Sequence, residues 1–425
     1  MYGLVIRNGL EVNMKAITGA TLIDGTGKPP VNNVTLLVDG DHIEAIGSTE
    51  GVSVPPGTDL IDAAGMTLLP GLIDCHDHLT SFTYELASRW GLTEPRSQRH
   101  MRVASVLRQT LESGYTTVRD AGGLDAGFRL AVEEGLIPGP RLQVGLGFIT
   151  PTGGMADRIG PSGHAPPVEP GSGLPWGVAD GPEAMRAKVR EMAKAGADVI
   201  KTATTGGASS AAGLGPRDML FGRDELEALV DEAHAQGKRV MCHALGGPGL
   251  RAAVEAGVDS IEHGTFLDED PDLFAIMAAK DTFFIPTFTV YTFHAELGTV
   301  HGRARAAELR PHHVESLRLA LEAGVKVVAG TDAGGWLHGN NAQEISCLVS
   351  AGMTPMQALV AATGDAAKCI GLDSVVGTVA AGMKADLILV NGDPLSDVTI
   401  LEHGKSIKLV MKDGRIVFNS DSLQG

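Results

Sequence analysis

Two histidines separated by one residue, His76 and His78, stand at the end of an apolar segment and have the spacing of a metal-binding pair. Alternate residues of a strand point to the same face, so the two imidazoles would project together while Asp77 points away. Residues 66–74 indicate a buried strand that delivers both rings to its carboxyl end. Two rings do not close a metal site, and an isolated pair is equally compatible with polar residues leaving a strand.

Further residues of metal-binding types follow downstream, each near the end of a short apolar stretch. They are Lys201 in 197–202, His243 in 239–244, His263 in 260–264 and Asp332 in 325–333. Helix-like segments fill the gaps, so polar residues recur at one structural position after successive strands. In a parallel barrel the carboxyl ends of the strands meet at one face. We therefore predict a metal site assembled from strand ends.

Helices and strands alternate through the middle of the chain. Residues 101–114 have the apolar stripe and the glycine end of a helix, and a strand is predicted at 115–120. The same unit recurs at 182–202, 223–243 and 252–263, and a late helix is predicted at 354–370. Repeated units of this kind favour an α/β fold, a (β/α)8 TIM-like barrel, over a sandwich or a helix bundle.

The two ends of the chain have a different character. Segments 14–25 and 34–47 near the start, and 384–390 and 407–418 near the end, indicate strands separated by glycine turns. We infer a small composite β-sandwich built from both termini. The predicted division is 1–70 for the first part of the β-sandwich, 71–372 for the hydrolase barrel and 373–425 for the second part of the β-sandwich. Met14 is a plausible start, so residues 1–13 are expected to be an upstream extension.

On these residues the chain resembles the amidohydrolase superfamily, and within it the imidazolonepropionase-related branch that includes metal-dependent dipeptidases of prolidase and arginine carboxypeptidase type. The resemblance covers nearly the whole chain. It implies two divalent ions, one held by His76, His78 and Asp332, the other by His243 and His263, and both bridged by Lys201 as a carbamate formed from CO2. An ammonium group there would repel two cations, whereas a carbamate supplies an anionic bidentate ligand. The alternative for Lys201 is a solvated or ion-paired lysine.

The implied ligands suggest hydrolysis by metal-bound hydroxide. Two cations would lower the pKa of a shared water and polarise the carbonyl under attack, and Asp332 would pass the proton to the leaving nitrogen as the catalytic residue. We predict cleavage of an amide, peptide, urea or carbamate. Zinc is the expected ion, although nitrogen and oxygen ligands accept other first-row metals. The alternatives are a Xaa-Pro or Xaa-Arg type dipeptidase, a mononuclear cyclic-amide hydrolase like imidazolonepropionase, and a noncatalytic scaffold.

Residues 147–181 are rich in glycine and proline and predict a loop over the active site. In the dipeptidase-like relatives, a histidine at the position of Met155 and a tyrosine at the position of Leu245 help to hold the substrate carboxylate. A carboxylate that faced Met155 and Leu245 would be poorly solvated, so we expect a neutral or hydrophobic substrate. His164 in the loop and His338 after Asp332 are further predicted substrate contacts.

Composition supports a soluble enzyme and adds little about its substrate. The 425 residues are 43% hydrophobic, which is enough for a barrel and a smaller domain. The net charge of −17 argues against nucleic-acid binding and against an anionic membrane surface. The four cysteines lack a closely spaced framework, so we predict that they are reduced residues of the core. Reduced cysteines favour a cytoplasmic location for the protein. The first ten residues are too short and polar for a secretory leader, and related barrels suggest a homo-oligomer.

Overall fold

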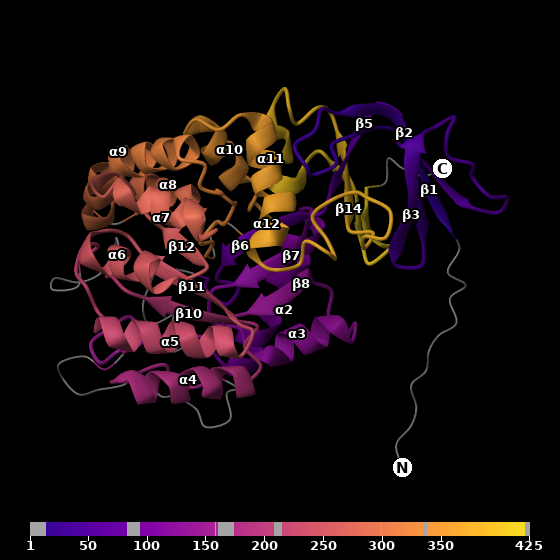
Figure 1. The fold of residues 1–425 in the computed structure, drawn as a ribbon. Coiled ribbons are helices and arrows are strands. Elements are labelled where there is room, and N and C mark those ends of the chain that lie inside the picture. Colours follow the sequence, from indigo (N-terminus) through magenta and orange to yellow (C-terminus); the bar gives the residue numbers. More distant parts are fainter. Residues whose placement is uncertain are drawn as a thin grey trace, which may run out of the picture.

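The computed structural model describes residues 14–82, 94–157, 159, 174–207, 215–298, 300–334 and 338–420. Within these ranges the chain forms a barrel covered by helices, beside a β-rich part (Figure 1). The α/β fold class predicted from the sequence is therefore confirmed.

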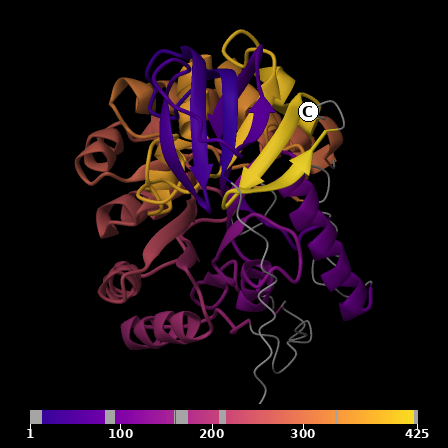
Figure 2. The ribbon, with the colours of Figure 1, turned by 90° about the vertical axis from the view of Figure 1, so that its right-hand side faces the viewer.

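One sheet combines strands from both ends of the chain, in the order β16-β15-β14-β5-β1-β2-β3, with β4 paired to β1. The strands are β1 (Lys15–Leu22), β2 (Val31–Asp39), β3 (His42–Ser48), β4 (Asp59–Asp62), β5 (Met66–Pro70), β14 (Leu387–Asn391), β15 (Ile407–Lys412) and β16 (Arg415–Asn419). Figure 2 shows the early indigo strands beside the late yellow ones, and antiparallel pairing of β5 with β14 joins the two groups. Ile17, Leu36 and Leu389 belong to a separate apolar core in this part. The domain boundaries at residues 70 and 372 stay a prediction.

The barrel strands pair in parallel. They are β6 (Leu72–Asp77), β7 (Tyr115–Asp120), β8 (Arg141–Val144), β9 (Phe148–Ile149), β10 (Val199–Ala203), β11 (Arg239–Ala244), β12 (Ser260–His263) and β13 (Phe283–Ile285). β6, β7 and β8 form one ladder, and β9 to β13 form another. The segment 326–333 closes the ring, because Val327 bridges Phe284 of β13 and Ala333 bridges Asp77 of β6. This closure brings Asp332 beside the first barrel strand.

The apolar run at 66–74 is not one strand, and that prediction was wrong. β5 belongs to the sheet built from both termini, whereas β6 belongs to the barrel, and the chain passes from one to the other at Gly71. A β-carbon at Gly71 would lie 2.1 Å from Oγ1 of Thr116. Glycine permits this close approach of the backbone to the neighbouring strand. β6 still delivers His76 to the carboxyl end of the barrel.

Helices follow the barrel strands and cover them. They are α2 (Arg96–Glu112), α3 (Ala126–Glu133), α4 (Pro182–Lys194), α5 (Arg223–Ala235), α6 (Gly247–Ala256), α7 (Asp272–Ala279), α8 (Phe288–Leu297), α9 (Val300–Glu322), α10 (Gln343–Ser350), α11 (Pro355–Ala361) and α12 (Gly364–Cys369), with short 3-10 helices η1 (Leu267–Glu269) and η2 (Val398–Gly404). On α4, Met185, Val189 and Met192 are buried, at the spacing of one helix face.

The helix predicted at 354–370 is divided into α11 and α12, so its prediction as one helix was wrong. The carbonyl of Ala361 accepts a hydrogen bond from the amide of Ala329, and the carbonyl of Ala362 accepts one from the amide of Ile73. These two carbonyls bind barrel backbone, and Thr363 leaves the helical conformation at φ −137° and ψ −97°. The start is as predicted, because Thr354 caps α11 and Pro355 occupies its first turn.

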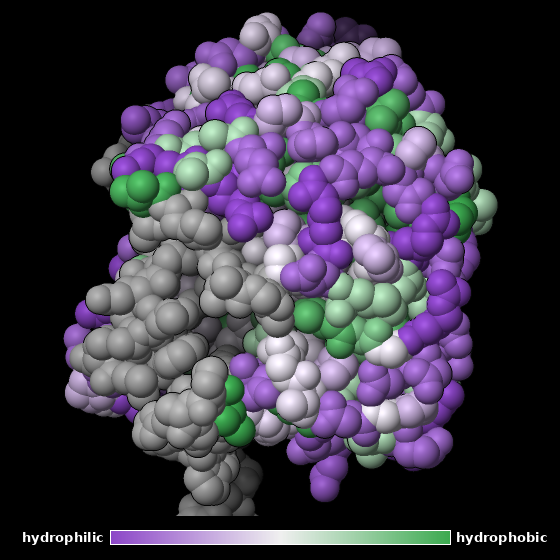
Figure 3. All heavy atoms as spheres, turned by 90° about the vertical axis from the view of Figure 1, so that its left-hand side faces the viewer, coloured by the Kyte–Doolittle hydropathy of each residue, from purple (hydrophilic) through white to green (hydrophobic). Residues whose placement is uncertain are grey.

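Among the coloured residues in Figure 3, hydrophilic side chains predominate, with apolar areas between them. Among the described residues, no helix has the length and apolar character needed to cross a membrane. Cys75, Cys242, Cys347 and Cys369 are free thiols.

Candidate metal centre

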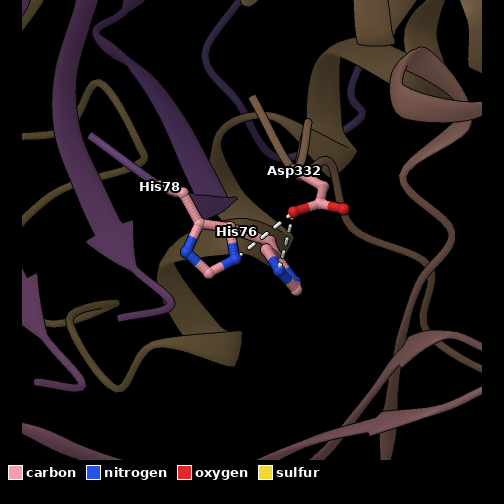
Figure 4. Close-up of side chains that lie close together, drawn as sticks. All are labelled: His76, His78 and Asp332. Carbon is pink, nitrogen blue, oxygen red and sulfur yellow. Dashed lines mark ion pairs between the residues drawn. The ribbon is translucent and has the colours of Figure 1, made fainter. Parts of the chain in front are cut away.

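Three predicted ligands lie together at the carboxyl end of the barrel. Nε2 of His78 is 3.3 Å and Nε2 of His76 is 3.6 Å from Oδ1 of Asp332 (Figure 4). The possible ligand atoms of the three residues all lie within 4.8 Å of one another, a geometry that can hold a metal ion. Asp77 points away and accepts a hydrogen bond from Asn341.

The backbone of the closing segment places Asp332 in this cluster. The amides of Thr331 and Asp332 donate to the carbonyl of His76 over 3.0 and 2.7 Å. Asp332 has a φ of +51°, in the left-handed region that residues with a β-carbon seldom adopt. Aspartate is one of the residues that tolerate this region best, and the surrounding hydrogen bonds hold it there.

A second pair of imidazoles lies against the first. His243 on β11 and His263 at the end of β12 belong to adjacent parallel strands, and their ring centroids are 4.5 Å apart. The ring of His263 lies 5.1 Å from the ring of His76. The structure therefore brings all four predicted histidines into one buried group. Their assignment to individual metal ions stays a prediction.

Each of the four rings has a hydrogen-bond partner on one nitrogen. The contacts are His76 Nδ1 to Glu262 Oε2 (2.6 Å), His78 Nδ1 to the Gly122 carbonyl (2.8 Å), His243 Nε2 to the Gly206 carbonyl (3.3 Å) and His263 Nδ1 to Thr287 Oγ1 (2.7 Å). Because a carbonyl or carboxylate only accepts, it fixes the proton on the nitrogen it faces and leaves the lone pair on the other. The orientation thus suits ligation by Nε2 of His76 and His78 and by Nδ1 of His243.

Burial favours the neutral form of these rings. Burial, followed by the charge of Lys201, lowers the pKa of His243 to about 3. Burial also holds the pKa of His76 and His263 well below the usual range for histidine. A neutral imidazole keeps the lone pair that a metal requires.

Lys201 on β10 is 1% exposed, which excludes a solvated lysine. Among the described residues its Nζ has no hydrogen-bond partner, and it lies 5.2 Å from the ring centroid of Phe148. Burial lowers the pKa of Lys201 to about 8, against the opposing effects of Glu262 and Asp332. An amine with this pKa has an appreciable uncharged fraction near neutral pH, and the uncharged amine is the form that reacts with CO2.

Two buried carboxylates that the sequence reasoning did not select organise the site. Asp120 at the end of β7 accepts hydrogen bonds from the amides of Leu79, Gly122 and Leu124. Burial raises the pKa of Asp120 to about 6. Its bonds shape the turn whose Gly122 carbonyl holds His78. Glu262 contacts His76 directly. The available signal was position, because Asp120 ends its strand and Glu262 immediately precedes His263.

An aromatic side chain also missed by the sequence reasoning lies beside the second pair. Tyr291 of α8 has its ring centroid 6.4 Å from that of His263 and 4.8 Å from that of His313. Oγ1 of Thr265 lies 3.1 Å from its hydroxyl oxygen. No local pattern marks Tyr291, since only the packing of α8 on the barrel brings it here.

The predicted substrate contacts have different surroundings. Met155 is half-buried in the turn after β9, whereas Leu245 is fully buried in an apolar cluster with Phe266 and Tyr291. His338 is nearly buried, with Nε2 3.1 Å from the carbonyl of Ser81 and Nδ1 3.7 Å from Oδ1 of Asp77. His164 lies outside the described residues, as does much of the predicted loop at 147–181. Their contact with substrate stays a prediction.

The donor set fits divalent first-row metals. Neutral imidazoles and a carboxylate are the ligands that zinc accepts, and the outer nitrogens of the rings are held as metal-binding histidines require. The Nζ of Lys201 is a buried polar atom without a hydrogen-bond partner in the described ranges, and a carbamate bound to metal would satisfy it. The cluster of His76, His78 and Asp332 is therefore a candidate metal site.

Comparisons with known proteins agree with this chemistry. Residues 67–417 match the family described as the Amidohydrolase family. Ochratoxinase of Aspergillus niger is 30% identical over 440 residues, covering 97% of this chain and 88% of that protein. Imidazolonepropionase of Fusobacterium nucleatum subsp. nucleatum is 24% identical, covering 91% and 92%. A solved structure of a Xaa-Pro dipeptidase with bound methionine is 33% identical with a TM-score of 0.85, covering 96% of this chain and 100% of that one. The superfamily and the branch predicted from the sequence are confirmed.

Proposed function

The chain belongs to the amidohydrolase family and is a hydrolase of carbon–nitrogen bonds, and we propose that it uses a binuclear metal centre to cleave an amide, peptide, urea or carbamate in a neutral or hydrophobic small molecule. The observation that carries the proposal is the cluster of His76, His78 and Asp332 beside the buried pair of His243 and His263. A cytoplasmic location and a homo-oligomer remain expectations.

In this proposal, His76, His78 and Asp332 hold one ion, His243 and His263 hold the other, and Lys201 bridges them as its carbamate. Bound divalent ions, expected to be zinc, would lower the pKa of a water and polarise the scissile carbonyl. The burial of Lys201 supports the bridging role, and so does its Nζ, which has no hydrogen-bond partner in the part of the chain that the structure describes. The alternative with one ion, as in a cyclic-amide hydrolase, would leave Lys201 without this role.

Asp332 is proposed as the proton carrier. Its side chain is 19% exposed, whereas the side chain of His76 is 1% and that of His78 is 9% exposed, so the carboxylate is the most accessible group of the cluster. It would accept the proton of the attacking water and deliver it to the leaving nitrogen, because an amine must be protonated to depart.

The preference for a neutral substrate rests on the surroundings of Leu245. One cation that contacts its apolar cluster is Arg217, whose guanidinium carbon lies 3.5 Å from the ring centroid of Phe266. Nε and Nη2 of this guanidinium already donate hydrogen bonds to the two carboxylate oxygens of Glu269. A substrate carboxylate near Leu245 would therefore compete with Glu269 for its cation.

The second candidate is a dipeptidase, which the similarity to a Xaa-Pro dipeptidase favours. Matched substrates separate the two, namely N-acyl-prolines with a free carboxylate and their amides, tested beside aryl ureas and carbamates. We expect kcat/KM to be at least about tenfold higher for the neutral member of each pair, which is about 1.4 kcal/mol. Preference for the free carboxylate would establish the dipeptidase instead.

A specificity variant sharpens this test. Met155→His introduces the histidine that the resemblance to dipeptidase-like enzymes implies at this position. We expect this variant to shift the preference toward the substrate with a free carboxylate. Met219→His is the matched control, because Met219 is 39% exposed. Equal behaviour of both variants would remove Met155 from the specificity argument.

A further inference from the structure

Glu262 lies in the barrel interior and contacts the ring of His76. Its side chain is 0% exposed, and its Oε2 is 2.6 Å from Nδ1 of His76. Its other oxygen, Oε1, accepts hydrogen bonds from Oγ of Ser260 over 2.6 Å and from Nη2 of Arg119 over 3.1 Å. Both carboxylate oxygens are therefore engaged, and their roles differ.

Arg119 completes the arrangement from the neighbouring side of the barrel. It extends from β7, its side chain is 1% exposed, and its Nε donates to the carbonyl of Cys75 over 2.7 Å. Cys75 directly precedes His76. The ion pair of Arg119 and Glu262 thus holds both the imidazole of His76 and the peptide group before it.

Glu262 differs from the partners of the other three rings. Those partners are the carbonyls of Gly122 and Gly206 and the hydroxyl of Thr287, all of them uncharged. A carboxylate accepts a stronger hydrogen bond from imidazole, fixes the proton on Nδ1 and increases the electron density at Nε2. A buried ion pair is itself weak evidence for stability, so a role in ligand orientation explains its placement better.

We propose that Glu262, held by Arg119, is a positioning residue that sets the tautomer and orientation of His76 for a divalent cation. The inference rests on the proposed function, because it requires a metal ion at His76. It predicts an effect on metal affinity that acts through one identified ring.

Glu262→Gln tests the tautomer directly. Arg119 and Ser260 both donate toward Oε1, so the glutamine oxygen should remain on that side and its NH2 group should face Nδ1 of His76. An NH2 group can only donate, so His76 would have to carry its proton on Nε2, the nitrogen that faces Asp332. We expect 15N histidine NMR of metal-free protein to show a switch from the Nδ1–H to the Nε2–H tautomer, with His76→Asn identifying the signal.

The second readout is the affinity for Zn2+, measured by competition with a chromophoric chelator. Glu262→Gln should weaken binding by about 10- to 100-fold. Glu232→Gln is the matched control, because Glu232 of α5 also pairs with an arginine, Arg190 of α4, and it should bind zinc like the wild type. If the single variant does not fold, Arg119→Met with Glu262→Gln removes both buried charges together and should still weaken binding about tenfold.

The outcomes separate the inference from the function on which it rests. A tautomer switch in Glu262→Gln together with weakened zinc binding supports the positioning role of Glu262. Affinity within about twofold of the wild type, or an unchanged Nδ1–H tautomer, would overturn the role of Glu262 and leave the metal centre intact. Wild-type protein that binds no divalent ion would overturn both.

Discussion

Replacing Lys201 with methionine should stabilise the metal-free protein while it removes the proposed bridging ligand. In metal-free protein without CO2, Lys201 is a buried amine whose Nζ lacks a hydrogen-bond partner among the described residues. Burial lowers its pKa to about 8 from an ordinary value of 10.5. Keeping this side chain charged at pH 7 therefore costs folding free energy.

The magnitude follows from the separation of the two pKa values, about 2.5 pH units at about 1.4 kcal/mol each. Lys201→Met should raise the free energy of unfolding at pH 7 by about 3 kcal/mol. For a chain of 425 residues that unfolds as one unit, this corresponds to about 3 °C in melting temperature.

The pH dependence has a definite sign. Between pH 8 and 10.5 the unfolded chain keeps the proton on Lys201 and the folded protein does not, so wild-type stability should rise with pH in this window. The rise should be absent in Lys201→Met.

The assay is thermal and urea unfolding of chelator-treated protein in CO2-free buffer from pH 7 to 10. Lys326→Met is the control, because Lys326 is 43% exposed and should change stability by less than about 0.5 kcal/mol. If Lys201→Met is no more stable than this control and the wild-type profile is flat above pH 8, the account of a desolvated Lys201 is refuted.

Three further predictions address the proton carrier, the joint between β5 and β6, and a buried acid. Asp332→Asn should lower kcat by about 10²- to 10⁴-fold without unfolding the protein, as steady-state kinetics and circular dichroism would show. Gly71→Ala should cost about 1–3 kcal/mol in urea unfolding, because the new β-carbon would lie 2.1 Å from Oγ1 of Thr116, and an unchanged midpoint would contradict this. Burial raises the pKa of Glu344 to about 8 from 4.5, so metal-free wild-type protein should lose stability from about pH 5 to 8. Glu344→Gln should lack this decline, and an identical pH profile would refute it.

The arrangement of the candidate site could be predicted from the sequence wherever a single strand determines the direction of the side chains. Alternation at the end of β6 and in the residue that follows it places His76 and His78 near each other and turns Asp77 away. Parallel strands bring His243 and His263 to the same end of the barrel. The strand-end positions were therefore readable from local pattern alone.

Features that depend on distant backbone were not predictable in this way. At Gly71 the chain passes from β5 to β6 in close approach to Thr116. α11 and α12 are separated where the carbonyls of Ala361 and Ala362 accept hydrogen bonds from barrel backbone. Glu262 stands next to His263 in the sequence, but its partner His76 is 186 positions away. Tyr291 likewise reaches the site only through the packing of α8.

The most direct test of a bridged binuclear centre is the metal content per chain of protein produced with zinc and bicarbonate, with Lys201→Met measured beside it. The account predicts about two ions per wild-type chain and a sharp fall in the variant. About one ion per chain in both proteins would contradict the bridged centre and favour the mononuclear cyclic-amide hydrolase.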